Sequence, residues 1–362
     1  MTLTAIVKLH PNDIIKSILD TMSQEYIDLV NDIVDYQTQQ IKWQTLSTSN
    51  VIASLPSAIK NQAIRDAKSL YKKYIKLHII PVLKKPVIYV NNQNYTVTTT
   101  GIEMPVLING KSKRINIPAN IPLETVNHIN KLITTNKGVK SAKGMLRITK
   151  KNGFYVATIS YEINCKPMVS DGIIMGVDLG IKCPAVCRTT SNSTKFIGNG
   201  RQIKYKKRYY AKKRKKLGKA KKLKAIKKLA NKEARWMQNV DHQISRQVVN
   251  YAIKNNVKQI NLETLANIRA TTRQSRKNNK SLHSWSFYRL ANYIEYKAAL
   301  AGIAVCYINP AYTSQTCPVC GKHNKCKDRL YKCSCGYKGH RDLVGAINIC
   351  KAPVLHGNSA VA

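Results

Sequence analysis

The sequence predicts an α+β protein of several domains, and three observations lead to that prediction. The chain has 362 residues, of which 43% are hydrophobic, so it is long enough for two or three domains with cores of their own. Residues 1–170 combine long helical patterns with short alternating strands. From residue 173 onward strands and helices follow one another, and a cysteine-rich segment precedes the last helix.

The N-terminal part begins with the strand pattern "TAIVKLHP". A helical pattern that starts at Pro11 follows, and then a second one, "SAIKNQAIRDAKSLYKKYIKL". From about Lys85 apolar and polar residues alternate between turn residues, as in "VIYVNNQNYTVTT" and "PVLINGKSKRINIP". We therefore expect a small β-barrel made of residues 1–10 and 82–170, with a helical lobe at 11–81 inserted after its first strand.

The C-terminal part has the element order of an RNase H-like domain. A buried strand, Ile173–Val177, ends in Asp178, two short strands follow, and a long basic stretch leads to the strand "VKQINLE". A helix, a strand and the final helix "DLVGAINIC" complete the order. This pattern predicts an RNase H-like domain at 171–310 and 341–352, interrupted by a cysteine-rich insertion at 311–340 and followed by a flexible tail at 353–362.

The charge balance predicts a polyanionic partner. The chain has 61 Lys and Arg against 18 Asp and Glu, a formal net charge of +43 that is far beyond what solubility requires. A membrane surface is disfavoured, because the basic residues are not confined to one amphipathic helix. No signal-peptide pattern and no run of roughly 18 apolar residues is present, so we expect a cytosolic protein that binds nucleic acid.

The densest basic segment is residues 201–235, with 18 Lys or Arg and a single acid, Glu233. Such a run is usually a solvated face or a disordered tail, but apolar residues recur within this one, which favours a helix or helix pair along a phosphate backbone. Tyr205, Tyr209 and Tyr210 could stack on bases or sugars there. The candidate nucleic-acid-binding residues are Lys206, Lys207, Arg208, Lys212, Lys213, Arg214, Lys215 and Lys216.

The cysteine-rich segment predicts a structural zinc site. Cys317 and Cys320 have the C-x2-C spacing of a metal-binding turn, and Cys333 and Cys335 form a second pair. Four thiolates around Zn2+ would leave no open position, so the metal would have no catalytic role. Reduced cysteines in a small core are the alternative, which the polar, short segment disfavours. Three nearby residues could substitute as ligands: Cys326, His323 and His340.

Three carboxylates predict a metal-dependent nuclease centre. Asp178 ends the first strand of the domain, Glu263 ends the strand in "QINLETL", and Asp342 opens the last helix, where Gly345 and Ala346 would allow close approach to the sheet. Taken singly, each acid has a structural explanation: Asp178 could begin a turn, Glu263 could pair with a lysine, and Asp342 could start a helix. Together, in a half of the chain with only eight acids from residue 171 onward, they suit two Mg2+ ions that hydrolyse a phosphodiester.

Five segments of this half resemble the TnpB family, the RNA-guided nucleases of insertion sequences that are ancestral to the type V CRISPR effectors. They are "GVDLGIK", "NLETLANIR", "WSFYRLANYIEYKAALAGI", "PAYTSQTCPVCG" and "CSCGYKGHRDLVGAINI", in the order of the family. The resemblance is specific for residues 171–350 and only architectural before them. It implies a split RuvC domain with Asp178, Glu263 and Asp342 as catalytic acids, and a zinc-binding target-loading module between the last two.

The same resemblance implies an RNA-guided DNA endonuclease of the prokaryotic cytoplasm, associated with the nucleoid. Residues 1–170 would then form a wedge barrel and a short recognition lobe, which hold a guide RNA and read a short motif beside the double-stranded DNA target. Base pairing would carry target specificity, and one RuvC site would cut both strands in turn. Because the recognition helices are few, either a monomer or a homodimer is expected.

Three other functions are compatible with parts of the sequence. An RNA-guided repressor without cleavage would be expected to have lost one of the acids, and all three are present. A carboxylate-triad DNA transposase usually has Glu on the last helix, where this chain has Asp342. A zinc-ribbon nucleic-acid-binding protein without chemistry leaves the placement of the acids unexplained.

Overall fold

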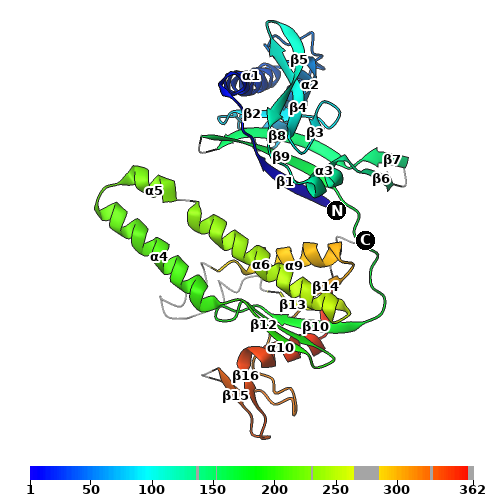
Figure 1. Ribbon diagram of the computed structural model, residues 1–362, viewed down its shortest axis with the longest axis vertical. Helices are drawn as coiled ribbons and strands as arrows, with labels where there is room; N and C mark the ends of the chain where they lie inside the picture. Colours follow the sequence, from blue (N-terminus) through cyan, green and yellow to red (C-terminus); the bar gives the residue numbers. More distant parts are fainter. Residues whose placement is uncertain (136–137, 152, 230, 265–284, 327–328, 358–362) are drawn as a thin grey trace. The chain divides into compact units, whose positions relative to one another are not determined.

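The computed structural model describes residues 1–135, 138–151, 153–229, 231–264, 285–326 and 329–357 (Figure 1). The chain forms two compact units, Met1–Asn164 and Cys165–Ala362. Within the described residues, none of the helices combines the length and the apolar character that a membrane crossing requires. The finer division into barrel, lobe, nuclease domain and cysteine-rich insertion stays a prediction.

The strands of the N-terminal unit form three separate antiparallel sheets. The largest has the order β1-β9-β8-β2, the second β3-β4-β5 and the third β6-β7. A bridge between Leu9 and Ala119 connects the ends of β1 and β5, but the described strands do not close into a single sheet. The bounds are β1 (Thr2–Lys8), β2 (Val87–Val90), β3 (Thr96–Val97), β4 (Gly101–Ile108), β5 (Lys111–Pro118), β6 (Leu132–Thr135), β7 (Gly138–Ser141), β8 (Lys143–Lys151) and β9 (Phe154–Glu162).

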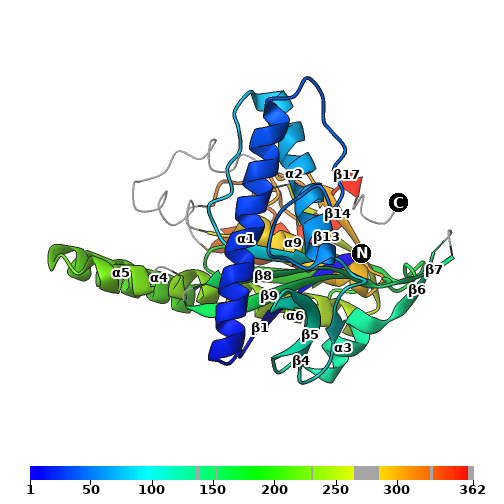
Figure 2. The same ribbon diagram turned by 90° about the horizontal axis from the view of Figure 1, so that it is seen from above.

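Two long helices, α1 (Asp13–Thr38) and α2 (Ser57–Leu77), lie side by side in this unit, and a short helix, α3 (Leu123–Asn130), follows β5 (Figures 1 and 2). Asn12 caps α1 by accepting a hydrogen bond from the backbone of Ile15. Buried Leu19, Tyr26 and Ile33 recur at intervals of seven, so one stripe of α1 faces the core. The sequence pattern that predicts these two helices is therefore confirmed.

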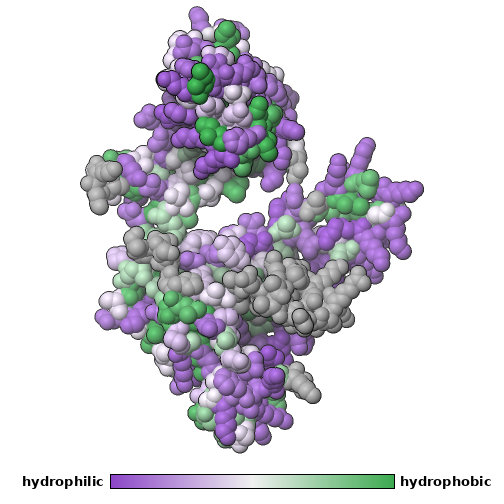
Figure 3. Space-filling view, turned by 180° about the vertical axis from the view of Figure 1, so that it is seen from behind, coloured by the Kyte–Doolittle hydropathy of each residue, from purple (hydrophilic) through white to green (hydrophobic). Residues whose placement is uncertain are grey.

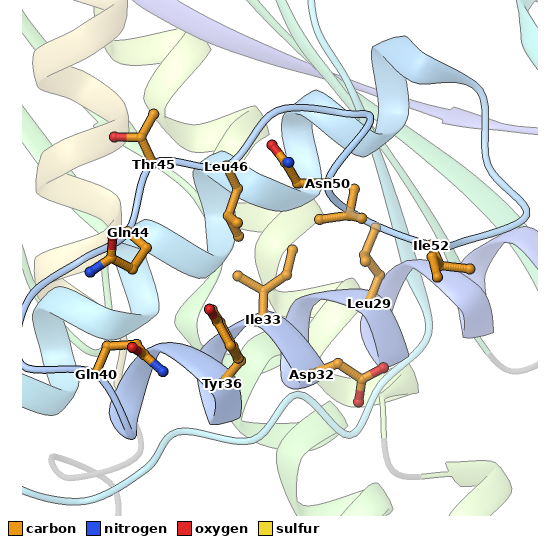
Figure 4. Close-up of a pocket in the computed structure, with 11 residues that line it drawn as sticks. Leu29, Asp32, Ile33, Tyr36, Gln40, Gln44, Thr45, Leu46, Asn50 and Ile52 are labelled. Carbon is orange, nitrogen blue, oxygen red and sulfur yellow. The ribbon is translucent and has the colours of Figure 1, made fainter.

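A pocket of about 620 Å³ opens between α1 and the segment that follows it (Figure 4). Its floor is apolar, and its rim has amide side chains and one carboxylate, Asp32. One carboxylate without a histidine or a cysteine does not provide the ligands of a metal centre. The lining residues are Leu29, Asp32, Ile33, Tyr36, Gln40, Gln44, Thr45, Leu46, Asn50, Val51 and Ile52.

The C-terminal unit is built on a mixed sheet with the order β12-β11-β10-β13-β14-β17. The strands β10, β13 and β14 are parallel, whereas β11, β12 and β17 pair antiparallel with their neighbours. The bounds are β10 (Ile173–Asp178), β11 (Ala185–Thr189), β12 (Thr194–Ile197), α4 (Gly200–Lys219), α5 (Leu223–Leu229), α6 (Lys232–Lys254), β13 (Val257–Glu263), α9 (Phe287–Leu300), β14 (Ala304–Ile308), β15 (Leu330–Lys332), β16 (Lys338–His340), α10 (Arg341–Lys351) and β17 (Val354–Gly357). This order confirms the predicted succession of elements.

One prediction for this unit is wrong. The sequence predicts a flexible tail from residue 353, but Val354–Gly357 form β17, which pairs with β14 at the edge of the sheet. An edge strand offers unpaired backbone donors and acceptors, and a short run containing Val354 and Leu355 can satisfy them. The remainder of the predicted tail, residues 358–362, lies outside the described residues.

Candidate active site and cysteine module

Two of the three predicted acids stand at the ends of adjacent parallel strands. Val177 of β10 pairs with Leu262 of β13, so Asp178 and Glu263, which end these strands, emerge at the same edge of the sheet. Strands rich in buried apolar residues fix this register, because Val177 and Leu262 both belong to the core of the unit. The site therefore lies at the carboxyl ends of the parallel strands.

Glycines allow α10, which carries the third acid, to lie close to β10 and Asp178. A Cβ atom on Gly176 would lie 2.3 Å from the carbonyl oxygen of Ala346 and 2.4 Å from the backbone nitrogen of Cys350, so only glycine permits this contact between strand and helix. A Cβ atom on Gly345 would lie 3.0 Å from Oδ2 of Asp178. Close approach of the last helix to the sheet, which the sequence predicts from Gly345 and Ala346, is thus present.

The electrostatics of the site reflect this convergence. Burial, together with repulsion from Glu263 and Asp342, raises the pKa of Asp178 well above its usual range, while Arg329 and Arg341 partly offset the rise. Burial also raises the pKa of Glu263, although a hydrogen bond of 2.5 Å from the hydroxyl of Thr313 to its Oε1 works in the opposite direction. A bound cation would stabilise the ionised forms of both carboxylates and so lower both pKa values, as expected of an acidic metal site.

Asp342 is buried, and only one of its two carboxylate oxygens has a hydrogen-bond partner among the described residues. The backbone nitrogen of Asp342 donates to Nδ1 of His340, the cap of α10, and Arg329 donates to its Oδ1. Its Oδ2 is buried and has no hydrogen-bond partner among the described residues. An orphaned carboxylate oxygen beside two further carboxylates fits a cation as the missing partner. The oxygens of the three acids are not, however, among the sets of three or more described ligand atoms within 4.8 Å of one another.

Arg329 and Thr313 are the contacts of the site that the sequence does not predict. Arg329 directly precedes β15 and reaches Asp342, whereas Thr313 lies in the loop after β14 and reaches Glu263. Neither has a spacing or periodicity that sets it apart from the other basic and hydroxyl residues of the chain. Only their position in the sequence could have indicated a role, because both residues belong to the insertion that separates the second acid from the third.

The four predicted cysteines come together. Cys317, Cys320, Cys333 and Cys335 are the one set of three or more potential metal ligands found within 4.8 Å in the part of the chain that is described. The sulfur atoms of Cys317 and Cys335 are 3.7 Å apart, and those of Cys320 and Cys333 are 3.5 Å apart. Four thiolates at Zn–S bonds of about 2.3 Å around a tetrahedral ion would have sulfurs about 3.8 Å apart, so the arrangement fits Zn2+.

The acidity of the cluster agrees with this fit. A backbone hydrogen bond from Cys335, with help from neighbouring thiols, lowers the pKa of Cys333 to about 6. For Cys335 a backbone hydrogen bond from Tyr337 acts downward, but desolvation and the neighbouring thiols raise its pKa to about 12. The cluster therefore favours the thiolate at Cys333 and opposes it at Cys335, where a bound cation would be needed to stabilise the charge.

The three residues considered as substitute ligands lie outside this set. His340 caps α10, and His323 packs against Tyr312. Cys326 contacts the small core around Cys317 and Tyr331 without joining the four sulfurs. Residues 311–340, called the cysteine module below, contain the two-stranded sheet β15-β16.

The basic stretch forms α4 and α5, which project as an arm that is largely hydrophilic on the face shown in Figure 3. Five of its candidate contacts are exposed: Arg208, Lys212, Lys213, Lys215 and Lys216. The other three, Lys206, Lys207 and Arg214, are half-buried. Arg214 forms an ion pair of 2.6 Å with Glu233, and the ammonium nitrogen of Lys207 lies 5.1 Å from the ring centroid of Trp285. Arg214 thus connects α4 to α6, and Lys207 packs against Trp285, two residues before α9.

Comparison with known proteins agrees with this architecture. Residues 158–269 match a family model described as a probable transposase, and residues 287–349 match the Cas12f1-like TNB domain. The Cas12f1 CRISPR-associated endodeoxyribonuclease of Sulfoacidibacillus thermotolerans is 28% identical over 346 residues, covering 87% of this chain and 79% of that protein. A TnpB-like protein of Methanocaldococcus jannaschii is 38% identical over 151 residues, covering 39% of this chain and 54% of that protein.

A solved structure shares the fold. The Cas12f1 chain in a Cas12f1–sgRNA–target DNA complex superposes with a TM-score of 0.66 and 18% identity, covering 94% of this chain and 84% of that chain. The fold and the two matched segments are thus similar to those of TnpB-like and Cas12f proteins. In the matched segments the chain is similar to the TnpB family.

Proposed function

We propose that the protein is an RNA-guided DNA endonuclease that cleaves DNA at the centre formed by Asp178, Glu263 and Asp342. The observation that carries the proposal is the convergence of these three buried or half-buried acids where β10, β13 and α10 meet. The similarity to Cas12f1 endodeoxyribonucleases and TnpB-like proteins supports the same activity.

The acids would bind Mg2+ and thereby bring a water and a phosphodiester together. Asp178 and Glu263 would supply oxygens from the sheet edge, and the unpartnered Oδ2 of Asp342 would supply one from α10. When bound, two Mg2+ ions activate the attacking water and stabilise the leaving oxygen of a phosphodiester. The raised pKa values of Asp178 and Glu263 mean that protons compete with the metal for these oxygens.

The remaining proposed parts hold the nucleic acids. The exposed lysines of α4 would bind the phosphates of the guide RNA and its DNA partner without reading sequence, while base pairing would select the target. Zn2+ held by the four cysteines would keep the cysteine module folded beside Asp342, so that the DNA strand passes it on the way to the metals. The N-terminal unit would hold the guide RNA and read a short motif next to the target.

The experiment is to purify the protein from cells that express its own locus and to sequence the RNA that stays bound. A discrete RNA species that is retained by the wild type supports the proposal, since the guided activity requires it. Retention of only heterogeneous cellular RNA would contradict the proposal that a specific RNA guides the protein. An Asp178→Ala variant is the control, because it should retain the same RNA while losing cleavage.

A further inference from the structure

A lysine is buried between two helices, α6 and α9, that lie side by side in the C-terminal unit (Figure 1). Lys297 of α9 is only 4% exposed. Its ammonium group donates to the carbonyl oxygen of His242 at 2.7 Å and to the hydroxyl of Ser245 at 2.6 Å. Both acceptors are neutral, and the rings of Tyr293 and Tyr296, with centroids 5.8 and 5.7 Å from the ammonium nitrogen, offset its charge only in part.

No carboxylate within the described ranges neutralises Lys297. The acid nearest in sequence to its acceptors, Asp241, is buried and already bound, at 2.6 Å to Arg289 and at 2.7 Å to Ser286. The charged group that shifts the pKa of Lys297 is another cation, Arg246 of α6. Burial, and then this repulsion, lower the pKa of Lys297 to about 8. A buried cation beside a second cation is unfavourable unless an anion is present.

The two cations line an open pocket of about 480 Å³ on the surface of α6 and α9. Arg246 is exposed there and forms no hydrogen bond or ion pair with another residue that the structure describes. The other polar groups of the pocket are amide, imidazole and phenol side chains, and none is acidic. The lining residues are His242, Gln243, Arg246, Gln247, Tyr296 and Lys297.

We propose that this pocket binds a phosphate group of a nucleic-acid backbone, with Arg246 and the buried Lys297 as its two cationic contacts. Guanidinium and ammonium groups are the usual partners of phosphate oxygens, and the pocket has amide donors to add to them. The pocket would fix the path of the nucleic acid along the α6–α9 face and would read no sequence. The inference rests on the proposed function only in that the chain must bind nucleic acid.

The test is the salt dependence of the affinity of the full-length protein for a DNA duplex of mixed sequence, measured by fluorescence anisotropy. Because Lys297 is buried and its replacement would disturb the packing of α6 on α9, the exposed Arg246 is the informative position. We expect Arg246→Gln to reduce the slope of log K against log salt concentration by about 0.9, the effect of losing one phosphate contact. Lys254→Gln removes an exposed charge from the same helix outside the pocket and should leave the slope unchanged.

A second arm separates backbone phosphate from free phosphate. The thermal unfolding temperature of each variant is measured with and without inorganic phosphate. If phosphate stabilises the wild type more than Arg246→Gln while the duplex slope stays the same, the pocket binds free phosphate and the assignment to nucleic acid is wrong. Equal slopes and equal stabilisation in both proteins would show that the pocket binds neither backbone phosphate nor free phosphate, and the proposal would be wrong. If the wild type itself binds no duplex, the proposed function falls as well.

Discussion

Arg329, just before β15 in the cysteine module, donates a hydrogen bond from its guanidinium group to Oδ1 of Asp342 on α10. The contact joins the module to the third acid of the candidate site across 13 residues of sequence. It also places a positive charge among three carboxylates, where it lowers the pKa of Asp178 against the effect of burial. The module is therefore part of the electrostatics of the site.

Replacing Arg329 should shift the pH dependence of the site. The carboxylate of Asp178 must be ionised to bind a cation, and its pKa is already raised, so Mg2+ binding is lost as pH falls through that pKa. Arg329→Gln removes a charge that favours the ionised form of Asp178, so we expect the acid limb of Mg2+ binding to move to higher pH. Isothermal titration with Mg2+ at a series of pH values measures the shift.

The matched control for this change is Lys332→Gln, which removes an exposed positive charge from β15 of the same module. Its acid limb should coincide with that of the wild type. An Arg329→Gln limb that stays in place, or that moves to lower pH, would contradict the role assigned to the guanidinium group.

Gly176→Ala tests the close approach of α10 to the sheet. The added methyl group would lie 2.3 Å from a backbone oxygen of α10, so the helix must move away from β10. We expect a loss of about 1–3 kcal/mol in the free energy of unfolding, and a loss of cleavage because Asp342 moves with the helix. Chemical denaturation measures the first effect. Gly218→Ala is the control, since a Cβ atom there would meet only Cδ1 of Ile226, at 4.0 Å, and the change should add up to about 1 kcal/mol to the stability of α4.

The cysteine cluster makes a prediction about metal content. Cys335→Ser removes one of the four converging thiols, and we expect the purified protein to lose its Zn2+ and the cysteine module to unfold locally. Cys326→Ser changes a cysteine of the same module that lies outside the cluster and should retain the metal. Elemental analysis of both variants decides the matter. Loss of Zn2+ from Cys326→Ser alone would mean that the ligand set is wrong.

The arm formed by α4 and α5 predicts a salt effect. Replacing the exposed Lys212, Lys213, Lys215 and Lys216 with Gln should reduce the slope of log K against log salt concentration for duplex binding by up to about 3.6, or about 0.9 for each phosphate contact. Lys207→Gln should instead lower the unfolding temperature with little change in slope, because Lys207 packs over Trp285. If the four-lysine variant keeps the slope of the wild type, the arm does not contact phosphate.

The parts of the structure that the sequence predicts are those set by local pattern. Asp178 and Glu263 could be placed because apolar runs end at them, and Asp342 because glycine and alanine follow it at helical spacing. The contacts of Arg329 and Thr313 depend on how the insertion folds back onto the sheet, which no local pattern reports. The inward direction of Lys207 and the pairing of β17 with β14 likewise depend on tertiary contacts.

The most direct test of the account is guided cleavage of DNA in the presence of Mg2+. The protein is loaded with its RNA after the guide segment has been exchanged for one that matches a chosen site, and the cut positions are mapped by sequencing. The account predicts that cleavage moves to the new site and that Asp178→Ala lowers its rate by more than about 100-fold without loss of RNA binding. Cleavage that ignores the guide, or that survives Asp178→Ala undiminished, would contradict it.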